Sequence, residues 1–390
     1  MAEPALFVPD PRVFPPVEST PPEARALYAL AETSLAADSQ QSADACDREL
    51  GSALAAALTR DGAELAALCS HAPSVAVTRH LWRSLDAVWR NAPSPGRGLA
   101  VTVFALPVVI VAGVEGGGRE SALPGVVRDP QSLAALLQEH AALRGNGNFA
   151  LADVLVAADA IDVARLPDIR AWQSLPEALA PGARLRGVDL VPSPIDVPTG
   201  GETVHLRFVL GTAIAAPEVD LLTDPDVGRW GIPFAQALAR DLATEGVSVL
   251  ALPRAPQRVL PAVAAGRSAQ REVSAQLFAS NAIRRFRGTV GEPSAVISAH
   301  RAPEALGGGE LRLSLSSPFD PRAAEGFRCP LYPLDRVDDV VAMLVALLRD
   351  CRVTDIRTLA GVYADRAPGC GSTLLFRPDT IPDTARVTVH

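Results

Sequence analysis

The sequence repeats one pattern three times: an apolar run typical of a β-strand, an amphipathic helical stretch, and a second β-type run. Each helix must bury its apolar stripe against another element, so the pattern predicts sheets covered by helices. We therefore predict an α/β (α+β) fold of repeated strand-helix-strand units with mixed sheets, preceded by a helical N-terminal region. The three units are predicted at 100–112, 130–144 and 149–157; at 203–215, 230–245 and 247–252; and at 311–316, 335–350 and 353–359.

The three predicted helices carry start and stop signals. Asp129 and Pro130 fit the N-cap and first position of the first helix, Gly246 follows the end of the second, and Asp335 can cap the third. Apolar residues at helical spacing then predict which faces are buried, so we expect all three helices to be packing elements. The buried face of the second helix is predicted at Trp230, Phe234, Leu238 and Leu242.

The length of 390 residues exceeds what one hydrophobic core usually organises, so we expect two or three domains. The last part of the chain is predicted to contain a long helix at 267–287 and a hairpin of 295–300 with 311–316. The predicted layout is a proline-rich lead at 1–22, a helical region at 23–92, a first α/β unit at 96–180, a linker at 181–202, and the second and third units at 203–390.

The composition excludes several kinds of chemistry. Because the chain has no lysine, it cannot use Schiff-base catalysis, a pyridoxal-phosphate anchor or a P-loop lysine. The five cysteines include no CxxC pair, and the histidines never lie three to five residues apart, so a zinc site has no support. The longest apolar run, 99–114, is shorter than a membrane span. We predict a cytoplasmic protein with no cofactor and no membrane segment.

Arginines cluster in one segment of this acidic protein. Residues 254–287 contain seven arginines and a single acid, whereas the whole chain has a net charge of −8. Guanidinium groups pair with phosphates or carboxylates, so the segment could bind nucleic acid or an acidic partner. Alternatively, the arginines complement the helix dipole and pair with the protein's own acids, an interpretation that we favour because of the acidic overall charge. The candidate binding residues are Arg267, Arg271, Arg284, Arg285 and Arg287.

Two further groups of residues are candidates for chemistry. Cys370 lies in a Gly-Cys-Gly turn, where backbone N–H groups could lower the pKa of its thiol, and His300 is the candidate base for it. Asp220, Asp224 and Asp226 precede the second helix and could hold Mg²⁺ at the end of a strand. Ordinary turn and capping chemistry explains both stretches, and we prefer that interpretation. We therefore predict no catalytic residue and no metal site.

Several apolar segments carry a family resemblance. They are FALADVLVAAD at 149–159, FVLGTAIA at 208–215, PLYPLD at 330–335, VALLRDC at 345–351 and VTDI at 353–356. With them the chain resembles an uncharacterised proteobacterial family of unknown function. The closing loop of that family carries a paired cysteine motif, whereas this chain has only Cys370 in the corresponding GCGSTLLF. The resemblance implies no activity.

Three functions follow as expectations. The first is a non-catalytic interaction or scaffold protein that self-associates or binds a protein partner, because elements suited to packing dominate and no catalytic constellation is evident. The second is an enzyme or small-ligand binder with a site at the loops that follow the strands. The third is a nucleic-acid-associated protein that uses the arginines of 254–287.

Overall fold

The structure is a computed structural model of the chain. It describes residues 22–58, 72–90, 100–115, 119–140, 142, 148–161, 192–215, 226–302, 309–320, 323–332, 334–363, 375–381 and 385–390. The chain divides into two compact units, which we call unit 1 and unit 2. Unit 1 comprises Met1–Cys46, Leu68–Leu81 and Arg271–His390, and unit 2 comprises Asp47–Ala67 and Trp82–Gln270.

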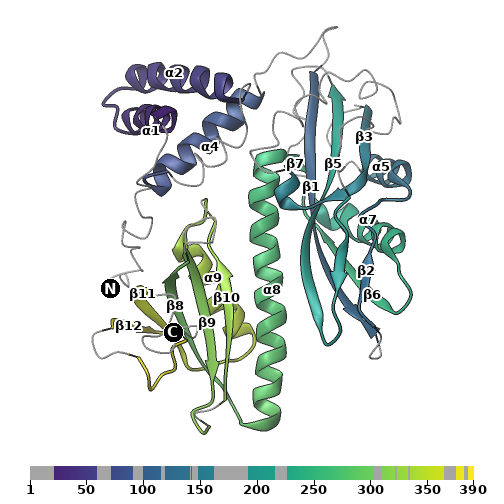
Figure 1. Cartoon of the computed structure of the whole chain (residues 1–390), viewed down its shortest axis with the longest axis vertical. Coiled ribbons are helices and arrows are strands. Elements are labelled where there is room, and N and C mark those ends of the chain that lie inside the picture. Colours follow the sequence, from purple (N-terminus) through teal and green to yellow (C-terminus); the bar gives the residue numbers. More distant parts are fainter. Residues whose placement is uncertain are drawn as a thin grey trace. The chain divides into compact units, whose positions relative to one another are not determined.

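The described residues form helices and mixed sheets, so the predicted α/β (α+β) class is confirmed (Figure 1). The helices are α1 (Pro22–Leu35), α2 (Gln40–Leu58), α4 (Val75–Arg90), α5 (Pro130–Glu139), α7 (Val227–Leu242), α8 (Val259–Thr289) and α9 (Val337–Asp350), with a short 3-10 turn, η3 (Ala158–Ile161). The strands are β1 (Ala100–Val114), β2 (Ser121–Leu123), β3 (Asn148–Val156), β4 (Ile195–Val197), β5 (Glu202–Ala215), β6 (Val247–Pro253), β7 (Gln257–Arg258), β8 (Ser294–Arg301), β9 (Gly309–Ser316), β10 (Ala324–Pro330), β11 (Ile356–Tyr363) and β12 (Val387–Val389).

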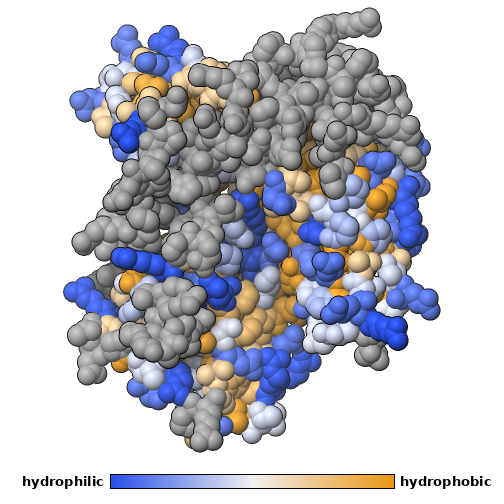
Figure 2. Space-filling model, viewed as in Figure 1, coloured by the Kyte–Doolittle hydropathy of each residue, from blue (hydrophilic) through white to orange (hydrophobic). Residues whose placement is uncertain are grey.

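The N-terminal region is helical, as predicted. Helix α2 buries Leu50, Leu54 and Leu58, which lie four residues apart and form one stripe. A methyl group added at Gly51 of α2 would lie 3.7 Å from Val88 of α4, so these two helices approach closely. In Figure 2 hydrophilic side chains lie at the outer edge of α1 and α2, with more apolar ones between them. Within the described residues, no helix has the length and apolar character needed to cross a bilayer.

Unit 2 is built on a sheet with the order β3-β5-β1-β6, and β7 adds to one end of β1. Every neighbouring pair is antiparallel, and β1 pairs with β5 from Ala100 opposite Ala215 to Gly113 opposite Glu202. Helix α5 follows β1 in the chain and α7 follows β5, which gives the split β-α-β, or ferredoxin-like, topology. The first two predicted strand-helix-strand units therefore share one sheet.

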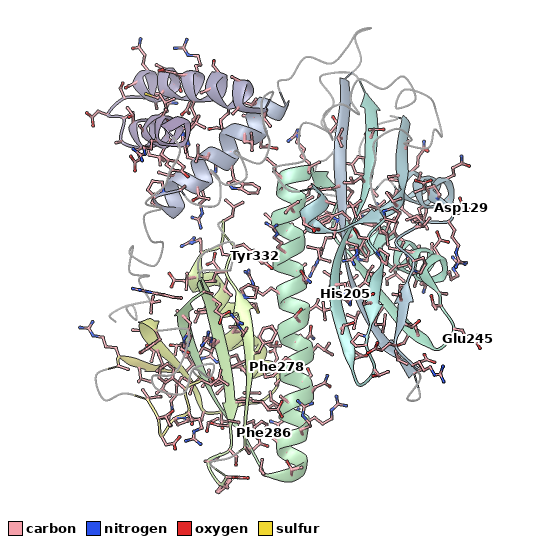
Figure 3. All side chains as sticks on the ribbon, in the orientation of Figure 1. Asp129, His205, Glu245, Phe278, Phe286 and Tyr332 are labelled. Atoms are coloured by element: carbon pink, nitrogen blue, oxygen red, sulfur yellow. The ribbon has the colours of Figure 1, made fainter. Side chains whose placement is uncertain are left out.

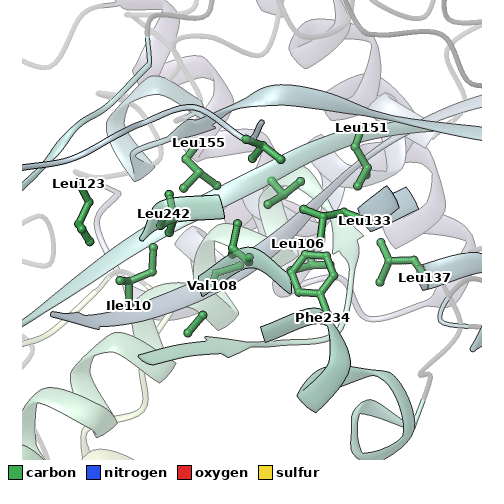
Figure 4. Close-up of a cluster of buried hydrophobic side chains, with 14 of the residues drawn as sticks. Leu106, Val108, Ile110, Leu123, Leu133, Leu137, Leu151, Leu155, Phe234 and Leu242 are labelled. Carbon is green, nitrogen blue, oxygen red and sulfur yellow. The ribbon is translucent and has the colours of Figure 1, made fainter. Parts of the chain in front are cut away.

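The main core of unit 2 lies between this sheet and helices α5 and α7 (Figure 4). Alternate side chains of β1 point into it, among them Leu106, Val108 and Ile110, as the two-residue period of a strand requires. Asp129 caps α5 as predicted, since its Oδ1 accepts a hydrogen bond from the Ser132 N–H at 3.0 Å. The predicted face of α7 is confirmed, because four side chains of that helix are fully buried: Trp230, Phe234, Leu238 and Leu242.

Gly211 of β5 has no room for a side chain. A Cβ there would collide with the ring of Phe104 and would lie 2.8 Å from the backbone oxygen of Ala150. We expect Gly211→Ala to lower the free energy of unfolding by about 1–3 kcal/mol, because neither neighbour can move cheaply. Urea unfolding followed by tryptophan fluorescence measures this loss. Gly201→Ala is the control, because open space surrounds Gly201; equal unfolding midpoints for the two variants would contradict the prediction.

Helix α8 is longer than the predicted 267–287 and contributes to the core of each unit. In unit 2, a methyl group at Gly266 would lie 2.9 Å from Leu206, so the first half of α8 packs directly on the sheet face opposite α5 and α7. In unit 1, the second half packs through Phe286 and Phe278, which are labelled in Figure 3. The ring of Phe278 stacks on Phe327 of β10 with centroids 5.3 Å apart.

Unit 1 is built on a mixed sheet with the order β10-β9-β8-β11-β12. The predicted hairpin is confirmed, because β8 and β9 pair antiparallel, whereas β11 runs parallel to β8. Helix α9 and the second half of α8 cover one face of this sheet. Helix α9 buries one apolar face, as its helically spaced apolar residues predict: Val340, Leu344 and Leu348 have exposed fractions of 3% or less.

The predicted cap of the third helix is wrong. Helix α9 begins at Val337, and its N-cap residue, Arg336, makes no side-chain capping hydrogen bond. Asp335 instead accepts a hydrogen bond from the Tyr332 N–H at 2.7 Å and forms an ion pair with Arg271. The side chain of Arg271 is 4% exposed, and a buried guanidinium requires a carboxylate partner. The need of Arg271 for a counter-charge therefore overrides the capping preference of Asp335.

Candidate functional site

A pocket of about 330 Å³ lies in unit 1, where α9 packs beside strands β8, β11 and β12. Helix α9 contributes Asp338, Val341 and Arg349, which share one side of the helix because they are spaced by multiples of three and four residues. Thr358 of β11 pairs directly with Thr388 of β12, and both line the same pocket. The pocket is mainly apolar with a few polar groups, which is the usual composition of a small-molecule site.

Asp338 is the unusual residue of the pocket. Its Oδ1 is buried and has no hydrogen-bond partner among the residues that the structure describes. Its position in the first turn of α9 gives it a favourable interaction with the helix dipole. A buried carboxylate oxygen without a hydrogen bond nevertheless costs free energy. A bound molecule with an N–H or O–H group would remove that cost.

The opposite end of α9 brings a positive charge to the pocket. Arg349 is exposed in the last turn of the helix, and its side chain makes no hydrogen bond or ion pair within the described ranges. His390 lies close by and forms a 3.0 Å hydrogen bond between its Nε2 and Thr358 Oγ1. Burial lowers the pKa of His390, and the charge of Arg349 lowers it further. His390 is therefore mainly neutral at pH 7.

A second polar cluster lies on the other face of the same sheet. His300, a predicted candidate, is 1% exposed, and its Nε2 lies 2.8 Å from Ser298 Oγ. The rings of Tyr363 and Phe376 pack against it, each with its centroid 5.9 Å from that of the imidazole. Cys370 lies outside the described residues, so its proposed pairing with His300 stays a prediction.

Glu310 holds two arginines on this face. Its carboxylate accepts hydrogen bonds from Arg312 Nε at 2.6 Å and from Arg328 Nε at 2.8 Å. The side chain of Arg312 is completely buried, whereas that of Arg328 is 51% exposed. Arg312 of β9 lies directly opposite Arg328 of β10, and Glu310 lies two residues before Arg312 on β9. This arrangement explains why the three side chains are close together. We interpret this cluster as part of the packing of unit 1.

Four of the five candidate arginines of α8 contact residues of unit 1. Arg271 pairs with Asp335, Arg285 with Glu325 at 2.5 Å, and Arg287 with Glu292 at 2.8 Å, while Arg284 donates to Asn281. Arg267 and Arg271 are buried, with exposed fractions of 9% and 6%. These contacts fit the interpretation that the arginines neutralise the protein's own acids. Binding of nucleic acid or of an acidic partner by these residues stays a prediction.

The candidate metal ligands fall in two places. Asp226 caps α7, because its Oδ1 accepts a hydrogen bond from the Gly228 N–H at 3.0 Å. Asp220 and Asp224 lie outside the described residues. Where the chain is described, no group of three or more His, Cys, Asp or Glu side chains is arranged to hold a metal ion.

Sequence reasoning missed the residues that line the pocket. It assigned no binding role to Asp338, Arg349, Thr358 or His390. One signal was present, because residues 338 and 349 are eleven positions apart, which returns a helix to the same side after about three turns. The strand that completes the pocket, β12, is three residues long and gives no periodic signal of its own.

Comparison with known proteins gives no relative: no family model matches the sequence, and neither a curated protein nor a solved structure is significantly similar to it.

Proposed function

We propose that this chain is a small-molecule-binding protein whose site is the pocket beside α9 in unit 1. One observation carries the proposal: a mainly apolar pocket is lined by Asp338, a carboxylate whose Oδ1 lacks a hydrogen-bond partner among the described residues. A protein gains nothing in stability from such an oxygen, whereas a ligand that donates to it gains both affinity and orientation.

This proposal develops the expectation of a small-ligand binder. The arginine-rich segment offers less support for a nucleic-acid role, because the guanidinium groups of Arg271, Arg285 and Arg287 are already paired with acids of unit 1. A scaffold role would be tested separately, by measuring the mass of the protein in solution.

Filling the pocket should abolish binding. We use 1-anilinonaphthalene-8-sulfonate as the probe, because its aromatic body suits an apolar pocket and its fluorescence rises on leaving water. Val341→Trp places a large side chain in the pocket, and Thr388→Phe fills it from β12. We expect each variant to weaken saturable probe binding by about tenfold or more, equivalent to about 1.4 kcal/mol.

Ala342→Trp is the matched control, because Ala342 is exposed on α9 and does not line the pocket. This variant should bind the probe as the original chain does. Far-UV circular dichroism identifies variants that fold, and Thr388→Phe lies in an exposed edge strand that tolerates aromatic residues. Unchanged probe binding by folded Val341→Trp or Thr388→Phe would overturn the proposal, as would the absence of saturable binding to the original chain.

A further inference from the structure

We infer that the ligand of this pocket is an elongated dipolar molecule, with an amine at the Asp338 end, an anionic group at the Arg349 end, and an apolar body between them. This inference rests on the proposed function and specifies the chemical class of the ligand. It depends on three features of the pocket. They are the positions of Asp338 and Arg349, the absence of a hydrogen-bonding partner for each among the described residues, and the apolar side chains that line the pocket.

The two charges lie at opposite ends of one helix. Asp338 is in the first turn of α9 and Arg349 is in the last, and both line the pocket. Eleven residues of helix separate their Cα atoms by about 16 Å along the axis. The long side chain of Arg349 shortens the gap that a ligand must span, so a chain of roughly eight to ten atoms fits between the two charges. The pocket therefore selects for length as well as charge.

Each end prefers a different charge. An ammonium group can pair with the carboxylate of Asp338, which lines the pocket and whose Oδ1 has no hydrogen-bond partner among the described residues. A carboxylate, sulfonate or phosphate can accept from the guanidinium of Arg349, and a guanidinium forms paired hydrogen bonds with such anions. The side chains of His390 and Thr358 hydrogen-bond to each other beside this end, and neither side chain carries a negative charge.

Much of the pocket wall is apolar. Ile297 of β8, Leu311 of β9 and Val341 of α9 are among the residues that line it. An alkyl or aryl segment can lie there without losing hydrogen bonds to water, whereas a hydroxylated body would lose them. A ligand with a single charge would leave either Asp338 or Arg349 without a counter-charge. The charges and the wall together favour a molecule with both charges and an apolar centre.

The inference is tested by competition against the same fluorescent probe on the full chain. The competitors are 8-aminooctanoate, which carries both charges, and octanoate and octylamine, which each carry one charge on a chain of equal length. We expect 8-aminooctanoate to displace the probe at a concentration about tenfold lower than either of the others. We also expect 4-aminobutanoate to compete poorly, because it is too short to reach both ends.

Two conservative substitutions separate the two ends. Asp338→Asn should weaken the binding of 8-aminooctanoate and octylamine by about tenfold and leave the binding of octanoate unchanged. Arg349→Gln should weaken the binding of 8-aminooctanoate and octanoate and leave the binding of octylamine unchanged. This crossed pattern would not follow from a general loss of folding, which would weaken all three competitors together.

The outcomes distinguish the inference from the proposed function. The inference of a dipolar ligand is wrong if octanoate or octylamine competes as well as 8-aminooctanoate. It is also wrong if Asp338→Asn does not weaken the binding of the competitors that carry an amine. Loss of probe binding in Val341→Trp and Thr388→Phe would still support the pocket as a binding site in that case. If these two folded variants keep probe binding, the proposed function fails and the dipolar ligand fails with it.

Discussion

Replacing Glu310 by glutamine is expected to lower the free energy of unfolding of unit 1 by about 3–5 kcal/mol. Glu310 is 3% exposed and supplies a carboxylate to Arg312 and Arg328. The side chain of Arg312 is completely buried, so its guanidinium cannot recover the lost interaction from water. Glutamine keeps the shape of the side chain but removes the negative charge. The loss therefore measures the cost of burying a guanidinium without this counter-charge.

The unfolding of unit 1 can be followed through Cys329. Burial, the largest cause, raises the pKa of its thiol to about 12, so the folded protein holds it as an unreactive thiol. Alkylation at increasing urea concentration, read by mass spectrometry of the Cys329 peptide, reports when unit 1 opens. With a urea dependence of about 1–3 kcal/mol/M, the expected loss for Glu310→Gln moves the midpoint down by about 1–5 M.

A double variant tests the physical reason. Glu310→Leu combined with Arg312→Met replaces the buried ion pair with apolar side chains of similar size. We expect this pair of changes to recover at least half of the stability that Glu310→Gln loses, because buried ion pairs often contribute little compared with apolar packing. A double variant as unstable as the single one would contradict this account, and so would a single variant with the original midpoint.

The elements that the sequence predicts well are those specified by local signals. The buried stripe of α7 follows from the four-residue spacing of Trp230, Phe234, Leu238 and Leu242, and all four are fully buried. The start of α5 follows from Asp129 and Pro130, a cap and a first-turn residue that act within a few residues of each other. Such signals depend on neighbouring positions, so one sequence is enough to interpret them.

Strand pairing could not be predicted in the same way. Strand β5 lies between β1 and β3, and its residues pair with β1 residues about a hundred positions earlier in the chain. Strand β10 was missed because Ala324, Gly326 and Pro330 weaken its β-type pattern. Periodicity shows that a segment is a strand, but it does not identify the segment with which it pairs.

Buried polar residues were misleading for a related reason. Along β9, Glu310, Arg312, Ser314 and Ser316 alternate with leucines, a pattern typical of a strand with one face in water. Both faces of β9 are in fact buried. Likewise, the sequence around Asp335 suggests a helix cap, but its carboxylate instead pairs with Arg271, which lies 64 residues earlier in the chain. The pocket escaped prediction because it combines α9 with a strand almost forty residues further along the chain.

Replacing Leu344 by aspartate is expected to unfold unit 1 without unfolding unit 2. Leu344 is fully buried in the core between α9, α8 and the unit 1 sheet. An unpaired carboxylate there lowers the free energy of unfolding by about 4 kcal/mol or more, which is a large part of the stability of a typical domain. Cys329 belongs to the same core, so its thiol should react with alkylating reagents in the absence of urea.

Tryptophan fluorescence supplies the internal comparison. All four tryptophans lie in the ranges of unit 2, and Trp230 is fully buried in the separate core beside α7. Their emission should therefore stay at the wavelength of the original chain while Cys329 becomes reactive. Ala346→Asp is the control, because Ala346 is exposed on the same helix and the change costs only the lower helix propensity of aspartate, about 0.7 kcal/mol. If Cys329 stays protected in the Leu344→Asp protein, α9 does not bury this face. If Cys329 becomes reactive and the tryptophan emission also shifts to the red, the two cores do not unfold separately.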